Sequence, residues 1–497
     1  EDVGMGYLAK DGETDYRIVI SKNAGENEIY ASSELSAYMR VSSNVKITIE
    51  TDEEETFSLD NHVISIGDTI YRNNVDLSDV DYSELESGGY IIKSFKNVYI
   101  IDSASRDGRI YGVYKFLERF FGIEFISYDT TYDPKYSVVV AEPIDLVDIP
   151  AFGVRDYYAY DAFYRGGVQL GLKLRNNSSR FASSEIIDQP YYYTYYCNYQ
   201  GNPNWFSERM GHTIVNLLAA DAYEKGINPA PNYKTNAGGA HSGLLYGYYG
   251  LHPEWYAYDP NSKYANSHGR SQWEICYSNG LTEDGNYDED AENSLIDKMI
   301  EICQRMILDE RNDGSRVIML GHGDDGSKCH CDKCERFYEK FGTFGGVTCV
   351  WANAIVGKVK EWMKQNDINK NVKFVIFAYN ISRPAPVVSD GKGGWTPVNE
   401  KVVLDEDIGI QMAYRVCNYH SIWDEKCEHN QELREQFSQW VTIAKWVEIW
   451  DYQSCFRHYL WYLPNLQTLK DNYQYYMTIN VNRVLSQGAP GEGRYYM

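Results

Sequence analysis

Two adjacent aspartates and three closely spaced cysteines stand out in one short segment of the chain. The segment "GHGDDGSKCHCDKC", residues 321–334, follows the apolar run "RVIML" and so begins where a buried strand should end. Neighbouring carboxylates such as Asp324 and Asp325 raise one another's proton affinity, so one of them can keep a proton near neutral pH and act as a general acid. We predict that this pair is catalytic, against the alternative of a polar "GDDG" turn.

The cysteines of the same segment allow more than one interpretation. Cys329, Cys331 and Cys334, completed by His330 or His322, could supply four ligands to zinc. A CxCxxC pattern without a clear fourth ligand falls short of the paired CxxC motifs of zinc sites. We therefore favour a disulfide between two of the three, or free thiols that brace the loop. No metal and no cofactor is predicted for the chemistry.

The surrounding sequence predicts a (β/α)8 barrel that would position these residues. Eight candidate strands occur at 152–160, 172–177, 212–219, 316–325, 373–380, 408–415, 446–452 and 482–488. They are nearly continuously apolar, as parallel strands buried on both faces are, and helices are expected at 290–310 and 349–366. Catalytic groups of such a barrel lie at the carboxyl ends of its strands.

The predicted strand ends carry an acidic and aromatic set of side chains. The residues that we predict to bind substrate there are Arg155, His212, Tyr379, Arg415, Trp450, Asp451, Tyr452 and Gln487. Carboxylates flanked by aromatic rings suit glycoside hydrolysis, because an acid protonates the leaving oxygen and rings stack on sugar faces. Any one of these residues could be a structural polar group whose hydrogen bonds are made within the protein. Their occurrence together at predicted strand ends favours a substrate-binding cleft. Glu448 lies deeper in its strand and is expected to be structural, with a reserve role as an acid.

A small α+β domain, residues 1–147, is predicted to precede the barrel of residues 148–497. Its short β-branched and aromatic runs predict strands at 16–21, 62–67, 89–95 and 97–102. A helix is expected at 26–43, and "YGVYKFLERFFG" at 111–122 has an apolar stripe of helical spacing that ends at Gly122 as a C-cap. The segment "AEPIDLVDIPAF", with two prolines, marks the boundary between the two domains.

The composition restricts the partners of the chain. Its 497 residues carry a net charge of -24, which counts against nucleic acid or an anionic membrane surface as the main partner. No apolar run of about 18 residues is present, so no membrane span is expected. The 45 tyrosines and 11 tryptophans suit protein cores and sugar-binding clefts alike. The start "EDVGMGYLAK" has no signal-peptide pattern and looks like a trimmed product, and we expect a secreted or cell-surface location.

Several segments resemble families that act on carbohydrates. The run "SASRDGRIYGVYKFLERFFGIEFISYD" resembles the small domain that precedes the barrel in α-glucuronidases and β-N-acetylhexosaminidases. In order along the chain, "HPEWYA", "EICYSN", "GDDGSKCHCDKC", "WANAIV", "FAYNISRPAP", "WVEIWDYQ" and "NVNRVLSQG" resemble the domain of unknown function 4838 group, classified as glycoside hydrolase family 163. The resemblance covers nearly the whole chain. It implies a retaining endo-β-N-acetylglucosaminidase acting on N-glycans or glycoproteins, with the acetamido group of the substrate as nucleophile.

The resemblance also implies roles for the aspartate pair. Asp324 would orient the acetamido group and Asp325 would protonate the glycosidic oxygen. Asn-Asp is the commoner pair in the group, so Asp324 departs from it, although a carboxylate also stabilises the positive charge of an oxazolinium ion. Two alternatives remain: an α-glucuronidase-like hydrolase with Arg155 and Arg415 as uronate ligands, and a non-catalytic glycan-binding protein on a degenerate barrel.

Overall fold

The computed structural model describes most of the chain. The described residues are 4–105, 107–127, 129–158, 165–177, 212–227, 248–262, 265, 267–308, 316–324, 326–455 and 463–488. They form two compact units, one of residues up to 177 and the other of residues from 212 to 488. The first unit therefore includes β11 (Val154–Tyr158) and α3 (Arg165–Lys173), which follow the domain boundary predicted after residue 147. Asp325 lies outside the described residues.

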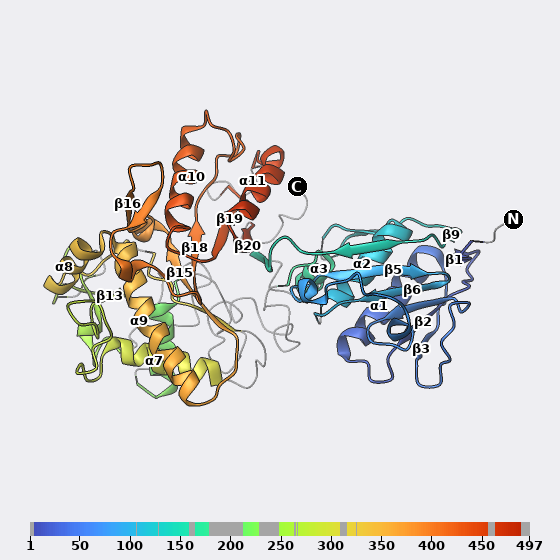
Figure 1. Cartoon of the computed structure of the whole chain (residues 1–497), viewed down its shortest axis with the longest axis horizontal. Helices are drawn as coiled ribbons and strands as arrows, with labels where there is room; N and C mark the ends of the chain where they lie inside the picture. The colour runs from blue at the N-terminus through green and yellow to red at the C-terminus, as the bar shows by residue number, and fades with distance from the viewer. Residues whose placement is uncertain are drawn as a thin grey trace. The chain divides into compact units, whose positions relative to one another are not determined.

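The first unit is built on a six-stranded sheet with the order β10-β5-β6-β4-β2-β3 (Figure 1). Its strands are β2 (Arg17–Ile20), β3 (Ile49–Thr51), β4 (Val63–Ile66), β5 (Tyr90–Phe95), β6 (Val98–Asp102) and β10 (Asp145–Asp148). Strands β3, β2, β4 and β6 are parallel, whereas β5 and β10 are antiparallel to their neighbours. Smaller ladders join β1 (Tyr7–Lys10) to β9 (Val138–Val140) and β7 (Glu124–Phe125) to β8 (Thr131–Tyr132). The four strands predicted before residue 103 are confirmed.

Both faces of this sheet are buried. Successive side chains of a strand point to opposite faces, and the strands carry apolar side chains on both. On one face Ile64 and Ile101 pack with the helices α1 (Glu26–Ser43) and α2 (Gly108–Phe121) in a large apolar core. On the other face Val63 and its neighbours form a smaller core. Both predicted helices are confirmed, and α2 ends at Gly122, whose φ of 60° lies in the left-handed region that glycine adopts without strain.

The second unit contains a parallel sheet with the order β20-β19-β18-β15-β14, curled like half of a barrel (Figure 1). Its strands are β14 (Arg316–Met319), β15 (Val372–Ala378), β18 (Ile408–Ala413), β19 (Val447–Tyr452) and β20 (Val481–Gln487). All four neighbouring pairs are parallel, which puts the carboxyl ends of the strands at one edge. The described residues of this unit thus form a mixed α/β fold with a parallel half-barrel, and not the complete eight-stranded barrel that was expected.

Two predicted barrel strands are wrong. The segment 172–177 overlaps the end of α3, and the segment 212–219 lies mostly in α6 (Ile214–Glu224). Short apolar runs fit a strand and a buried helix equally well, and length decides between them. The apolar run of 212–219 continues to Ala222 within an eleven-residue helix, and its side chains are buried at helical spacing.

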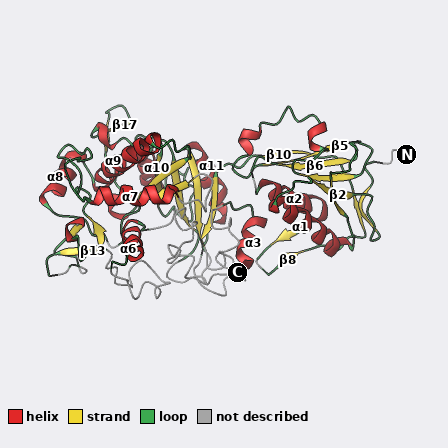
Figure 2. Ribbon diagram, turned by 90° about the horizontal axis from the view of Figure 1, so that it is seen from below, coloured by secondary structure: helices red, strands yellow, loops and turns green. Residues whose placement is uncertain are grey.

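Helices cover one face of the half-barrel (Figure 2). The predicted helices at 290–310 and 349–366 are confirmed as α7 (Leu295–Leu308) and α9 (Phe344–Gln365), and they are followed by α10 (Glu428–Trp440) and α11 (Leu466–Thr478). Helix α9 packs on β15 and β18, and α11 packs on β20. Helix α9 starts earlier than expected because the Thr343 side chain accepts a hydrogen bond from the Gly346 amide, 2.9 Å away, and so caps its first turn.

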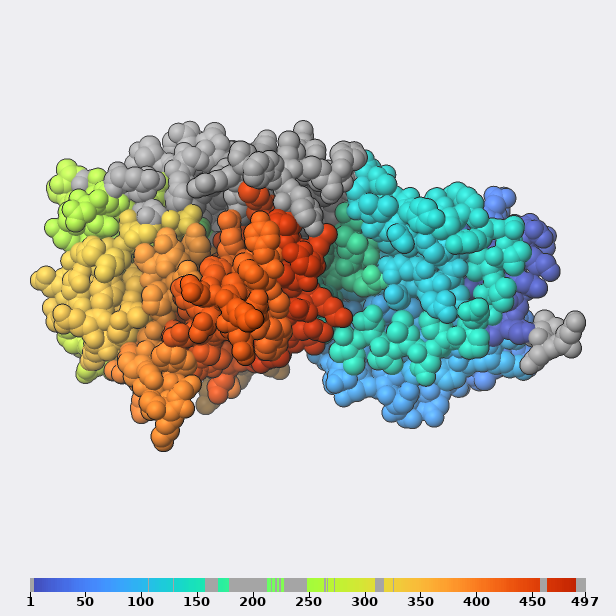
Figure 3. Space-filling view, turned by 90° about the horizontal axis from the view of Figure 1, so that it is seen from above, coloured from blue at the N-terminus to red at the C-terminus, as the bar shows by residue number. Residues whose placement is uncertain are grey.

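Smaller elements complete the second unit. They are the pair β12 (Tyr256–Tyr258) and β13 (Arg270–Ile275), the helix α8 (Asp332–Phe341), and the pair β16 (Val387–Ser389) and β17 (Trp395–Pro397). The hairpin β16–β17 projects from the body of the unit (Figure 3). Among the described helices, none is both long and apolar enough to cross a membrane.

Candidate active site

Asp324 lies at the carboxyl edge of the half-barrel, five residues beyond β14. Its Oδ1 accepts a hydrogen bond from the hydroxyl of Tyr379, 2.8 Å away, and Tyr379 directly follows β15. The Nε2 of His212 lies 3.8 Å from the same oxygen. The Asp324 side chain is 34% exposed, so a ligand in solvent can reach it. The structure therefore brings together three of the residues that the sequence predicted for the site.

The hydrogen bond of His212 Nδ1 determines which ring nitrogen carries a proton. Nδ1 lies 2.6 Å from the backbone oxygen of His322, and a carbonyl oxygen only accepts, so Nδ1 carries a proton. Nε2 is then the nitrogen that faces Asp324 and that gains or loses a proton. When His212 is protonated, the two side chains form an ion pair at the site.

The backbone before Asp324 is held by two buried polar residues, Glu274 and His322. The sequence did not single out Glu274, and it indicated His322 only as a possible zinc ligand. Oε2 of Glu274, at the end of β13, accepts from the Gly323 amide at 2.8 Å. The His322 ring lies 2.7 Å from both the Gly323 carbonyl oxygen and the Ser382 hydroxyl. Burial lowers the pKa of His322 to about 4, so the ring is neutral at neutral pH, with Nδ1 donating and Nε2 accepting. The sequence carried no clear signal for Glu274, because β13 reads RSQWEI and its other polar residues do not set Glu274 apart.

A glycine allows the chain to turn after the aspartate pair. Gly326 has a φ of 75°, which is in the left-handed region that residues with a Cβ rarely adopt. A cavity of about 450 Å³ opens directly beyond it, lined by Asp259, Gly326, Lys328, His330, Thr343, Phe344, Ile381 and Pro384. The loop that carries Asp324 therefore continues along the wall of a space that can take a ligand.

An aromatic wall is formed by the ends of β19 and β20. Side chains two residues apart in a strand share a face, which places Trp450 and Tyr452 on the same side of the sheet. Trp450 Nε1 donates to Oε1 of Gln487 at 2.6 Å, and the rings of Trp450 and Tyr452 lie 6.4 Å apart. The pKa of Tyr452 is raised to about 12, first by burial and then by the negative charge of Asp324. The positive charge of Arg415 lowers the pKa of Tyr452 and so opposes this shift. Tyr452 therefore lies within the electrostatic field of Asp324.

Asp451 points to the opposite face of the sheet. It pairs with Ser486 across the ladder, and its Oδ2 accepts from Gln453 Nε2 at 2.5 Å. Burial is the first cause that raises the pKa of Asp451, to about 6. The structure does not bring this predicted substrate-binding residue together with Trp450 and Tyr452, because neighbours in a strand face opposite sides.

Glu448 lies on the same face as Trp450, one layer deeper in the sheet. It forms an ion pair with Arg483, with the Glu448 Oε2 and Arg483 Nη1 atoms 3.0 Å apart, and it also accepts from Gln411 Nε2 at 2.9 Å. Gln411, Glu448 and Arg483 occupy neighbouring positions on three adjacent strands, and all three are fully buried. These contacts make Glu448 part of a buried polar layer below the site.

Arg155 belongs to the first unit, where backbone oxygens surround its guanidinium. It donates to the carbonyl oxygens of Ser87, Phe152 and Arg175 at 2.9–3.0 Å. Burial lowers the pKa of Arg155 from its ordinary value of 12.5. Arg415 differs, because it lies exposed just beyond β18.

In the described part of the chain, two groups of side chains are suited to a metal ion, and neither includes Asp324. They are the four thiols of Cys276, Cys329, Cys331 and Cys334, and the trio of Cys417, His420 and Cys427. The Asp324 site itself combines a carboxylate, an imidazole, a phenol and aromatic rings. Such groups are able to transfer protons, to stabilise a developing positive charge and to stack on a sugar ring.

The sequence model of the family described as "Domain of unknown function (DUF4838)" matches residues 125–496. The chain belongs to the DUF4838 family. The match spans all five strands of the half-barrel and Asp324. None of the curated proteins matches the sequence of this DUF4838 chain.

Solved structures similar to the DUF4838 chain include several glycoside hydrolases. A family GH115 4-O-methyl-α-glucuronidase has a TM-score of 0.47 and 11% identity over 97% of this chain and 55% of that one, so the chain spans about half its length. A β-N-acetylhexosaminidase from Bacteroides fragilis NCTC 9343 has a TM-score of 0.43 and 12% identity over 97% and 82% of the two chains. An N-acetyl-β-hexosaminidase from Streptomyces plicatus has a TM-score of 0.43 and 10% identity over 98% and 86%.

Proposed function

We propose that this DUF4838 chain is a glycoside hydrolase of the type classified as family 163. Its activity would be that of a retaining endo-β-N-acetylglucosaminidase on N-glycans. The observation that carries the proposal is the position of Asp324 at the mouth of the half-barrel. Tyr379 and His212 contact its carboxylate, and its charge reaches Tyr452 in the aromatic wall. Membership of the family supports the same assignment.

In the proposed reaction, the acetamido oxygen of the substrate attacks the anomeric carbon while the glycosidic bond breaks. Asp325 gives its proton to the departing oxygen, and Asp324 accepts a hydrogen bond from the acetamido N–H. The attack leaves a positive charge on the oxazolinium ring, which the Asp324 carboxylate stabilises. Water then adds to the anomeric carbon and returns a proton to Asp325, so that two inversions retain the configuration. The hydroxyl of Tyr379 keeps the Asp324 carboxylate in one orientation during both steps.

The cavity lined by Gly326 offers space for further sugar units of a glycan, because the loop that carries Asp324 continues along its wall. An α-glucuronidase-like activity is less well supported, because it would use Arg155 or Arg415 for the uronate. The guanidinium of Arg155 already donates to three backbone oxygens within its own unit.

A series of aryl 2-acetamido-glucosides with zero to three fluorine atoms on the acetyl group tests the reaction type. Fluorine withdraws electrons from the carbonyl oxygen, so kcat/KM should fall steeply with each fluorine if that oxygen is the nucleophile. Equal rates across the series, or equal rates on the glucoside with a 2-hydroxyl, would overturn the proposal.

The substrate class requires a second measurement. Mass spectrometry of a glycoprotein after digestion should show one N-acetylglucosamine left on each asparagine and the rest of the glycan released whole. Release of free N-acetylglucosamine alone would indicate an exo-acting enzyme instead.

A further inference from the structure

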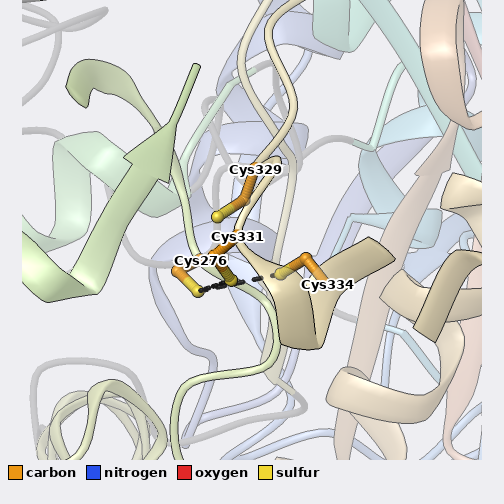
Figure 4. Close-up of side chains that lie close together, drawn as sticks. All are labelled: Cys276, Cys329, Cys331 and Cys334. Carbon is orange, nitrogen blue, oxygen red and sulfur yellow. Dashed lines mark hydrogen bonds between the residues drawn. The ribbon is translucent and has the colours of Figure 1, made fainter. Parts of the chain in front are cut away.

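Four cysteine side chains from three segments of the second unit converge on one point (Figure 4). Cys276 follows β13, Cys329 and Cys331 lie in the loop after Asp324, and Cys334 lies in the first turn of α8. Their sulfur atoms all lie within 4.8 Å of one another, and all four cysteines are free thiols. Cys276 is 53 residues from Cys329 in the sequence and supplies the fourth ligand that the CxCxxC pattern lacked.

We propose that Cys276, Cys329, Cys331 and Cys334 bind one zinc ion as a structural site. Zinc bound by thiolates is tetrahedral with Zn–S distances of about 2.3 Å, which puts neighbouring sulfurs about 3.8 Å apart. Cys276 Sγ lies 3.8 Å from Cys331 Sγ and 3.7 Å from Cys334 Sγ. A single ion at the centre of the four sulfurs therefore fits with little movement of the chain.

The surroundings of the sulfurs suit a buried thiolate site. Cys276, Cys329 and Cys334 are buried, and they pack with Ala257 in a small core of their own. The Tyr258 amide donates to Cys329 Sγ at 3.3 Å, and the positive end of α8 begins at Cys331. Both features stabilise negative charge on sulfur, which zinc ligands require.

The two histidines considered as the fourth ligand are engaged elsewhere. His330 Nδ1 lies 2.5 Å from a carboxylate oxygen of Glu335. Both ring nitrogens of His322 lie 2.7 Å from oxygen atoms, those of Gly323 and Ser382. An all-sulfur site is also the donor set that selects zinc over magnesium or calcium.

The zinc ion would link the end of β13 to the loop that carries Asp324, and the hydrogen bond between Glu274 and the Gly323 amide links the same two segments. Cys276 comes two residues after Glu274, and Cys329 comes five residues after Asp324. The ion therefore fixes the far end of the loop that presents the aspartate pair, while Glu274 holds the near end. In this position the ion is a structural cross-link and takes no part in proton transfer.

Metal analysis of the full chain, purified under reducing conditions, tests the proposal. We expect one zinc ion per chain by mass spectrometry of the elements, and X-ray absorption with four sulfur neighbours at about 2.3 Å. Cobalt(II) exchanged into the site should give the charge-transfer and d–d bands of a tetrahedral thiolate complex. Iron in place of zinc at the same four sulfurs would overturn the choice of metal.

Two single variants locate the ion. Cys276→Ser should weaken zinc binding, measured by competition with a chromophoric chelator, by more than the roughly 10–100-fold that loss of an outer-shell partner costs. Cys417→Ser is the matched control, because Cys417 belongs to the second group of possible ligands. It should leave zinc content unchanged.

Metal content and thiol reactivity distinguish the possible outcomes, and no activity measurement is needed. Zinc lost from Cys417→Ser but kept by Cys276→Ser would overturn the proposal. So would a native chain without metal whose four thiols react freely with iodoacetamide, or one that shows the mass of a disulfide among them. Should Cys276→Ser fail to fold, the native chain still decides through its metal content and its absorption spectrum.

Discussion

Asp451→Asn should stabilise the protein at neutral and alkaline pH without weakening substrate binding. The Asp451 carboxyl is 7% exposed and faces away from Trp450 and Tyr452. Burial raises its pKa from 3.8 to about 6, so it must ionise in a poorly solvated place as the pH rises. An asparagine has the same shape and does not ionise.

The size and sign of the effect follow from proton linkage. Because the folded carboxyl binds its proton more tightly than the unfolded one, the folded state holds more protons between about pH 4 and pH 6. Its contribution to stability is full below about pH 4 and is lost as the pH rises through about 6. A difference of about two pKa units corresponds to about 3 kcal/mol in the free energy of unfolding.

Denaturant unfolding of both proteins at pH 4 and pH 8, followed by tryptophan fluorescence, measures this. The stability of Asp451→Asn relative to the native chain should increase by up to about 3 kcal/mol between the two values. Asp407→Asn is a control of opposite sign: burial opposes ionisation there, but Lys360 and Lys373 hold the pKa of Asp407 below 3.8. A carboxyl with a lowered pKa loses its contribution to stability only as the pH falls below 3.8. Removal of Asp407 should therefore cost nearly the same stability at pH 8 and pH 4, and less at about pH 2.

Two results would refute the placement of Asp451. One is a stability difference that does not change with pH, which would mean that the carboxyl is solvated in the folded state. The other is a large rise in KM for Asp451→Asn with unchanged stability, which would place the carboxylate against the substrate.

The other predictions concern the site itself. Tyr379→Phe removes a hydrogen bond to the charged Asp324 carboxylate, which is worth about 1.5–3 kcal/mol. The change should lower kcat/KM about 10–150-fold, while the far-UV circular dichroism spectrum stays the same. An unchanged kcat/KM would show that Tyr379 takes no part in the reaction. Asp325→Asn should slow release of an N-glycan by about 10²–10⁴-fold, and hydrolysis of an activated aryl glycoside much less. Asp324→Ala should slow both substrates, and equal losses for Asp325→Asn on both would move the acid elsewhere. Glu274→Gln replaces one accepting oxygen by a donor and should lower kcat by up to about 100-fold with little change in KM; a change in KM alone would count against a positioning role.

Much of the local structure could be predicted from the sequence because it depends on residues close in the chain. Periodicity and local backbone preferences predict the apolar stripe of α2 and its end at Gly122. They also predict the five strands of the half-barrel, β14, β15, β18, β19 and β20. Two short segments were assigned wrongly as strands, because the pattern of six to eight residues does not separate a strand from a helix. The position of Asp324 after β14 also followed from local order alone.

Contacts between distant segments were decided only by the tertiary structure. The sequence by itself determined that three cysteines lie together after the aspartate pair, but the fold brought Cys276 to them from the end of β13. Likewise, the fold surrounded the guanidinium of Arg155 with backbone oxygens and brought Glu274 to the amide before Asp324. Local sequence sets the conformation of a segment, whereas the partner of a polar side chain depends on which segments the packing of the whole unit places beside it.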